Sequence, residues 1–226
     1  SDPVALTRFF DCWRKIATRA KGNADVIYGY DLLNEPVHEL PPTTLDYLAT
    51  YEKAAKIVRA IDPQTPVIVQ SLDWAAPEAF AQLRPIDGDN VVYQVHLYRP
   101  KEFTHQGAGG NMKADAVWPD AAKGWGRGYL RQKLAAVRDF EKKYNAKIYV
   151  GEFSASSFST GADVYIADCI ALFEEYGWDW TYHAFREWEG WSVEHEPVET
   201  DGKPAGFKPS ADNPRKRALL RGLRGA

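Results

Sequence analysis

The sequence has few cysteines, no strong excess of charge and no long hydrophobic run, and each of these narrows the class of protein. Its 226 residues include two cysteines, Cys12 and Cys169, far apart in segments with helical patterns. Two such residues make neither a disulfide framework nor a metal-ligand cluster. The net charge of −3 indicates no nucleic-acid or membrane partner. No apolar run approaches the roughly 18 residues of a membrane-spanning helix.

A phosphate-binding loop of the Gly-x-x-x-x-Gly-Lys-Ser/Thr type is also missing, which argues against an α/β nucleotide-binding protein. What the chain has in abundance is aromatic residues, with 8 Trp, 12 Tyr and 10 Phe. A hydrophobic core uses some of these rings. Exposed rings in loops serve as flat apolar platforms of the kind that bind sugars.

Secondary-structure patterns alternate along the chain. Five runs rich in β-branched and aromatic residues predict strands: Val26–Tyr30, Val67–Gln70, Val91–Leu97, Ile148–Val150 and Trp178–Phe185. Helical patterns occupy Val4–Ala20, a segment ending at Ile61, Pro77–Leu83, Tyr129–Tyr144, Asp163–Tyr176 and Pro214–Leu223. Strict alternation predicts parallel strands joined by crossover helices, in an open doubly wound sheet or a (β/α)8 TIM barrel. The longer loops, 100–128 and 186–213, follow strands, which in a barrel is the catalytic face.

Two glutamates each end an apolar strand. Glu35 follows the first predicted strand within Asn34-Glu35-Pro36, and Glu152 follows the fourth within Gly151-Glu152-Phe153. The carboxyl ends of parallel strands meet at one edge of a sheet, so we expect the two acids on the same side of the molecule. A pair of carboxylates there is what glycoside hydrolysis needs.

A third motif ends the third predicted strand. His96 and Tyr98 are two residues apart, so they face the same side of that strand. From these residues alone, a buried histidine and a core tyrosine remain an equal alternative.

Taken in order, Asn34-Glu35-Pro36, His96-x-Tyr98, Gly151-Glu152-Phe153 and a Trp-rich last strand resemble glycoside hydrolase family 5. The family lies within the clan of (β/α)8 retaining glycosidases that includes cellulases and β-mannanases. The resemblance extends from Val26 to Trp191.

The resemblance implies roles for these residues. Glu35 is expected to be the general acid/base on barrel strand four, and Glu152 the nucleophile on barrel strand seven. The pair implies a retaining mechanism through a covalent glycosyl-enzyme, without metal or cofactor. Substrate-binding roles are implied for Asn34 at the sugar 2-hydroxyl, for Tyr98 as a hydrogen-bond donor to Glu152, for His96 near Glu35, and for Trp188 as a sugar platform, with Trp191 or Phe185 as alternatives.

The departure from the family is the lack of barrel strands one to three. The chain is expected to be a single catalytic domain, residues 1–226, that forms the C-terminal portion of the barrel and supplies about five of its eight strands. Five strands cannot close such a barrel, and open edges are exposed to aggregation. We therefore expect a fragment, a second chain or self-association to account for the missing strands. The resemblance also implies a secreted, extracellular protein.

Other side chains have less specific patterns. Trp74, Trp118 and Trp125 follow strands and are candidates for further sugar subsites, or ordinary half-buried rings. Several acidic residues lie in the last loop, but their spacing is not that of a calcium-binding loop. The basic residues from Arg215 to Arg224 are expected on the solvent face of the last helix.

The function predicted is a retaining hydrolase of β-1,4-linked polysaccharide, an endoglucanase. A β-mannanase or another β-glycanase of the clan is one alternative. An inactive carbohydrate-binding fragment is another, because it would keep the aromatic residues but lack turnover.

Overall fold

The structure is a computed structural model that describes residues 2–37, 46–108, 115–200 and 203–225. The chain divides into two compact units. Unit 1 comprises Ser1–Val95 and Ala136–Tyr149, and unit 2 comprises His96–Ala135 and Val150–Ala226. The division passes through strands β3 (Val91–Leu97) and β4 (Lys147–Phe153), so each unit contains part of both strands.

Unit 1 is built on the beginnings of the parallel strands. The strands follow chain order, with β1 (Tyr30–Asp31), β2 (Val67–Gln70), β3 and β4 as successive neighbours. Tyr30 pairs with Val67, and Val67 pairs with Val91, both in parallel register. All four residues of β2 are buried, as expected for a strand covered on both faces.

Helices of unit 1 cover this sheet. Helix α1 (Pro3–Ala20) packs against α2 (Tyr47–Arg59), and α6 (Ala135–Tyr144) places Phe140 edge-on against Tyr93 of β3. Helix α2 begins where the Asp46 carboxylate accepts hydrogen bonds from the first free backbone N–H groups, at 2.9 and 3.2 Å. The unit also contains α3 (Leu72–Ala75) and the 3₁₀ helix η1 (Pro77–Ala81).

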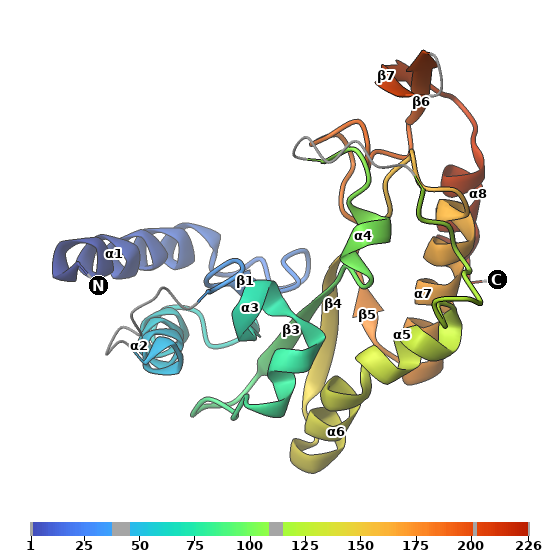
Figure 1. Cartoon of the computed structure of the whole chain (residues 1–226). Coiled ribbons are helices and arrows are strands. Elements are labelled where there is room, and N and C mark those ends of the chain that lie inside the picture. The colour runs from blue at the N-terminus through green and yellow to red at the C-terminus, as the bar shows by residue number, and fades with distance from the viewer. Residues whose placement is uncertain (1, 38–45, 109–114, 201–202, 226) are drawn as a thin grey trace. The chain divides into compact units, whose positions relative to one another are not determined.

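Unit 2 contains the ends of β3 and β4 and then β5 (Asp179–Trp180), again in chain order. Helices α7 (Ala162–Tyr176) and α8 (Pro214–Leu223) lie side by side (Figure 1). Gly177 ends α7 in the left-handed conformation, at φ 70°, which suits glycine. Two shorter helices, α4 (Lys101–Thr104) and α5 (Arg127–Lys133), belong to the same unit.

Several predicted elements differ from the observed ones. Strands β2 and β3 and helix α8 have the predicted bounds. The first predicted strand was wrong over most of its length, because only Tyr30 of Val26–Tyr30 joins a ladder. The helix predicted over Tyr129–Tyr144 is two helices, α5 and α6, with a break at Leu134.

The segment predicted as the last loop contains an antiparallel hairpin, β6 (His195–Thr200) and β7 (Lys203–Pro209). Prolines within both strands obscured it in the sequence, because proline weakens a strand pattern. The expectation for the basic tail was also wrong at one position: Arg215 is 6% exposed. None of the helices in the described part of the chain has the length and hydrophobicity that crossing a bilayer requires.

Candidate active site

Glu35 of unit 1 lies in the turn directly after β1, as the sequence predicts. Its backbone φ is 48°, a left-handed conformation that ordinary residues adopt only where surrounding contacts enforce it. The backbone N–H of Glu35 donates to Gln70 Oε1 at 2.7 Å. Gln70 ends the neighbouring strand β2 and is fully buried, so the turn is tied to a rigid part of the core.

The Gln70 amide also organises the residues on either side of Glu35. Its Nε2 donates to Asp31 Oδ2 at 2.8 Å and to Asn34 Oδ1 at 3.3 Å. One buried side chain therefore satisfies three groups of the segment that carries the candidate acid/base and the predicted 2-hydroxyl ligand. Sequence reasoning missed Gln70; a polar residue at the end of a fully apolar strand was the available signal.

Tyr51 of helix α2 supports the same turn. Its hydroxyl donates to the Leu33 carbonyl at 2.6 Å and accepts from the Gln70 backbone N–H at 3.2 Å. Burial raises the pKa of Tyr51 well above its ordinary value, so the hydroxyl keeps the proton that it donates. The turn is thus held from β2 and from α2.

Trp74, predicted to bind sugar, follows the carboxyl end of β2 in unit 1. Trp74 is 62% exposed, and residues 73–75 all have positive φ values, from 54 to 62°. This short irregular segment turns a large aromatic ring outward. An exposed indole is an available surface for a sugar ring.

Glu152 of unit 2 lies within β4, and its side chain is surrounded by polar groups from other segments. The Tyr98 hydroxyl donates to Glu152 Oε2 at 2.7 Å, so the predicted hydrogen bond is present. His96 Nδ1 lies 3.7 Å from Oε1, and His183 Nδ1 lies 3.7 Å from Oε2. The hydrogen bond from the hydroxyl fixes the orientation of the carboxylate.

His183 was not singled out from the sequence. It lies beyond β5, where its backbone N–H donates to the Phe153 carbonyl at 3.2 Å, and its Nε2 lies 2.6 Å from Glu187 Oε2. Its position in the last predicted strand, just before an acidic loop, was the available signal. The ring links the carboxylate of Glu152 to the loop that follows β5.

Trp191 forms an aromatic wall in unit 2 beside the partners of Glu152. Its indole stacks on Tyr98, with ring centroids 5.5 Å apart and planes inclined by 25°. It also meets His183 at 5.4 Å and His105 at 5.2 Å, and its Nε1 donates to the Thr104 carbonyl at 3.2 Å. Trp191 therefore touches two of the residues that contact Glu152.

The other two candidate platforms after the last strand have different surroundings. Trp188 packs edge-on against Trp191 at 5.2 Å and lies so close to Gly190 that a Cβ there would meet the indole at 2.4 Å. Phe185 is 66% exposed. Of the three rings, Trp191 is the one that contacts Tyr98 and His183.

Two other tryptophans considered for subsites differ in burial. Trp118 is 3% exposed, and its Nε1 donates to Asp168 at 3.0 Å, so it belongs to the core of unit 2. Trp125 is half-buried, with the Lys123 ammonium 4.4 Å from its ring centroid. Among the acids of the last loop, Glu194 accepts from Arg186 at 2.8 Å, which together with nearby cations lowers its pKa. This contact gives Glu194 a partner within the protein.

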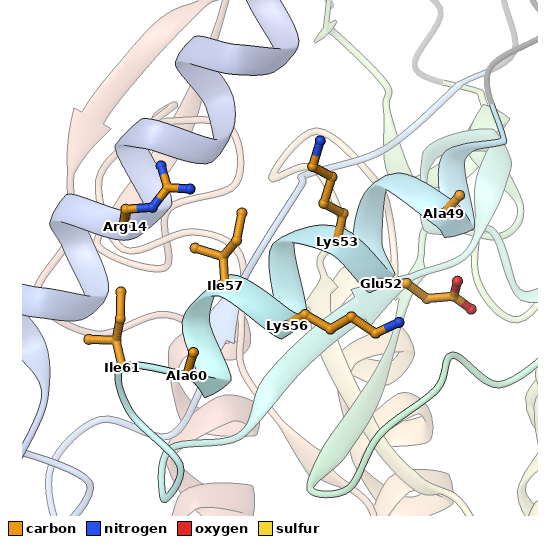
Figure 2. A pocket seen from close by; sticks show the side chains of 8 residues that line it. All are labelled: Arg14, Ala49, Glu52, Lys53, Lys56, Ile57, Ala60 and Ile61. Carbon is orange, nitrogen blue, oxygen red and sulfur yellow. The ribbon is translucent and has the colours of Figure 1, made fainter.

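A groove of ≈ 680 Å³ on unit 1 lies between helices α1 and α2, away from the turns described above (Figure 2). Its lining includes the basic side chains of Arg14, Lys53 and Lys56 and the apolar ones of Ile57 and Ile61. None of the predicted site residues lines this groove. It is a feature of the helical flank of unit 1.

Comparison with known proteins gives a consistent family. The family model described as Cellulase (glycosyl hydrolase family 5) matches residues 3–188. Endoglucanase C of Acetivibrio thermocellus is 27% identical over 87% of this chain, and Cellodextrinase A of Ruminococcus flavefaciens is 26% identical over 69%. The chain spans 65% of the first relative and 46% of the second.

Solved structures of the same family have a fold similar to that of this chain. Cel5A of Thermotoga maritima, in a complex described with a mannotriose substrate, matches at a TM-score of 0.76 and 25% identity, covering 98% of this chain and 67% of that one. The alternating parallel strands and helices are thus the greater part of a (β/α)8 barrel. The chain belongs to glycosyl hydrolase family 5.

Proposed function

We propose that this chain carries the catalytic carboxylates of a retaining glycoside hydrolase that cleaves β-1,4-linked glucan, as an endoglucanase does. The observation that carries the proposal is the Glu152 carboxylate, which Tyr98 holds by a 2.7 Å hydrogen bond beside the Trp191 wall. Membership of family 5 and the presence of Glu35 in the turn after a second parallel strand support it.

The proposed mechanism is a double displacement. The ionised Glu152 attacks the anomeric carbon, and the bond from that carbon to the leaving oxygen breaks while Glu35 gives that oxygen its proton. The glycosyl-enzyme ester is then hydrolysed: Glu35 takes a proton from water, and the water oxygen displaces Glu152. Both carboxyl groups end in their starting states, and no cofactor enters the balance.

Substrate-binding roles follow the same proposal. Asn34, next to Glu35, binds the 2-hydroxyl of the sugar that is cleaved. His96 and Tyr98 orient the nucleophile, and Trp191, backed by Trp188, supplies an apolar surface for a sugar ring. Trp74, which is 62% exposed, offers a further subsite for a longer glucan chain.

The proposal treats residues 1–226 as one catalytic domain whose barrel is completed by further strands. Exposed apolar side chains of unit 1 support this view: before β1, Val26 is 77% and Tyr28 42% exposed, and in α1, Val4 is 55% and Ile16 45% exposed. Exposed apolar side chains are available for contact with a partner. The remaining strands belong to a longer protein of which this chain is a fragment, come from a second chain or are replaced through self-association. As a polysaccharide hydrolase, the protein acts outside the cell and is secreted.

The experiment is a product assay on soluble carboxymethylcellulose, with the mass of the active material measured by light scattering. Release of reducing ends that disappears in Glu152→Gln supports the proposal. Active material larger than one chain of 25.5 kDa supports completion of the barrel by a partner. Tight binding of cello-oligosaccharides without any turnover would instead identify an inactive carbohydrate-binding protein.

A β-mannanase is the second candidate, and one observation favours it: the Thermotoga maritima enzyme that this chain resembles has been solved with mannotriose as well as with cellobiose. Parallel assays on soluble mannan separate the two. A higher kcat/KM on mannan than on glucan would reassign the substrate and leave the roles of the two glutamates unchanged.

A further inference from the structure

Arg215 stands out in unit 2 because it is a buried cation whose guanidinium donates to several backbone carbonyls. It lies in the first turn of α8, in a basic run, yet it is only 6% exposed. A buried guanidinium is costly unless its donors are satisfied. The groups that accept its hydrogen bonds therefore indicate which segment Arg215 holds in place.

The guanidinium of Arg215 donates to the backbone of the loop that carries Trp191. Its Nη1 reaches the carbonyls of Gly190 and Trp191, both at 3.2 Å, and its Nη2 reaches those of Ser192 at 2.8 Å and His195 at 2.9 Å. A fifth bond goes to the Ala155 carbonyl, at 3.3 Å, just beyond β4. One rigid fork thus connects this loop to the segment that follows Glu152.

Neighbouring groups complete the clamp. The Asn213 side chain donates to the Val193 carbonyl at 2.7 Å, and the Ser210 backbone N–H donates to the Glu194 carbonyl at 2.8 Å. Every carbonyl from Gly190 to His195 therefore accepts a hydrogen bond, and most of the donors come from Arg215 or from the few residues before it. These hydrogen bonds fix the path of the chain through Trp191.

We propose that Arg215 is a positioning residue of the candidate active site, which holds Trp191 stacked on Tyr98 and so fixes the wall beside Glu152. The expected effect on catalysis rests on the proposed function, but the expected effect on the orientation of Trp191 does not. Tyr182 supports the same point, since its hydroxyl donates to the Trp191 carbonyl at 2.7 Å. Without the fork, the indole loses its fixed orientation, and a small misplacement of this kind costs an enzyme on the order of 10²-fold in rate.

Unit 1 provides a matched control. Arg59 of α2 also donates to five carbonyls: those of Asp62, Pro63, Thr65, Asp89 and Asn90, at 2.7 to 3.4 Å. These carbonyls belong to the turns that precede β2 and β3, and no proposed site residue lies in those turns. Replacing Arg59 therefore removes a comparable structural contact without touching the Trp191 loop.

The first readout needs no activity. The full chain is labelled with 5-fluorotryptophan, and the ¹⁹F resonance of Trp191 is assigned with Trp191→Phe. In Arg215→Met the Trp191 signal is expected to shift or broaden while the Trp13 signal stays in place, and Arg59→Met is expected to leave the Trp191 signal unchanged. An unmoved Trp191 signal in Arg215→Met, or an equal effect of Arg59→Met, would overturn the proposal. Arg215→Lys, which keeps the charge, is the milder variant and should move the signal less.

The second readout is kinetic. We expect kcat/KM on soluble β-1,4-glucan to fall about 10²-fold in Arg215→Met, to recover partly in Arg215→Lys, and to stay unchanged per folded molecule in Arg59→Met. Added to Trp191→Ala, Arg215→Met should cause no further loss, because both changes act through one ring. An additional full loss would contradict positioning through Trp191. A wild-type chain without turnover would defeat the proposed function alone, since the ¹⁹F result still decides the role of Arg215.

Discussion

Glu35 is fixed through its main chain, whereas Glu152 is fixed through its carboxylate. In unit 1 the Glu35 N–H donates to Gln70 at 2.7 Å in a turn with positive φ. In unit 2, Glu152 continues a regular strand, and its side chain receives the Tyr98 hydroxyl at 2.7 Å. A nucleophile must stay ionised and keep one orientation, while an acid/base changes its protonation at each step. The two kinds of support fit these two proposed roles.

The largest expected effects come from the glutamates themselves. Glu152→Gln removes the nucleophile and should lower kcat on glucan by at least about 10⁴-fold. Glu35→Gln should lower it by about 10²- to 10⁴-fold. The two are separated by an aryl cellobioside with a good leaving group, which needs no proton and should rescue formation of the glycosyl-enzyme in Glu35→Gln only. Glu189→Gln, in the exposed loop, is the control. If the aryl cellobioside rescued Glu35→Gln and Glu152→Gln equally, the assignment of different roles to the two glutamates would be contradicted.

Tyr98→Phe tests the support of the carboxylate with little change in packing. The phenyl ring keeps the stack on Trp191 but loses the hydroxyl that donates to Glu152. A hydrogen bond to a charged group contributes about 1.5–3 kcal/mol, so kcat/KM should fall about ten- to one-hundred-fold. Steady-state kinetics on soluble glucan measure this, with Tyr144→Phe as control. Wild-type kinetics in Tyr98→Phe would show that the bond has no part in catalysis.

Gln70→Leu tests the support of the main chain at Glu35. The change leaves the Glu35 N–H without its partner and should cost about 1–3 kcal/mol of the free energy of unfolding. It should also lower kcat/KM, because the turn no longer holds Glu35 in one place. Denaturant unfolding and kinetics are compared with the exposed control Gln82→Leu. Lost stability with unchanged kinetics would reduce Gln70 to a structural role.

The smallest effect on activity is expected at Asp62, which lies in unit 1 and bears on stability alone. Its burial raises the pKa, but hydrogen bonds from Thr65, Tyr30 and Gln64 outweigh this and lower it from 3.8 to about 2. A lowered pKa stabilises the fold above pH ~4, and this contribution is lost as the pH falls toward ~2.

Asp62→Asn should therefore reduce the free energy of unfolding by about 2 kcal/mol at neutral pH and leave kcat/KM unchanged. Below pH ~3 the difference from wild type should shrink. Denaturant unfolding across this pH range measures it, with the exposed Asp25→Asn as control. A stability difference that persists unchanged at pH ~2 would mean that ionisation of Asp62 is not its source.

The sequence predicted best those parts whose local pattern matches their environment. Strands β2 and β3 are continuous apolar runs buried on both faces, so their bounds were predictable. Residues 26–29 have the same strand character, but a strand needs a neighbour, and ladder pairing in the described sheet begins only at Tyr30. Strand propensity alone does not show where pairing starts.

The candidate site shows the same limit. The sequence predicted that Glu35 follows the first strand and that Glu152 lies near the end of the fourth, and the family resemblance implied the bond from Tyr98 to Glu152. Gln70 and His183 were missed, since each acts on residues about thirty positions away. Arg215 was assigned to solvent, because a basic run on a helix gives no sign that one member is buried under a loop. Loop paths decide such contacts, and they depend on tertiary packing.

The central claim, that Glu152 is the nucleophile of a retaining enzyme, is tested most directly by trapping its covalent intermediate. The active material is incubated with an activated 2-deoxy-2-fluoro-β-cellobioside, digested with pepsin and examined by mass spectrometry. The account predicts one added fluorodisaccharide, attached to Glu152, and no such adduct in Glu152→Gln. A label on any other residue, or hydrolysis of the substrate with inversion and without a covalent adduct, would contradict it.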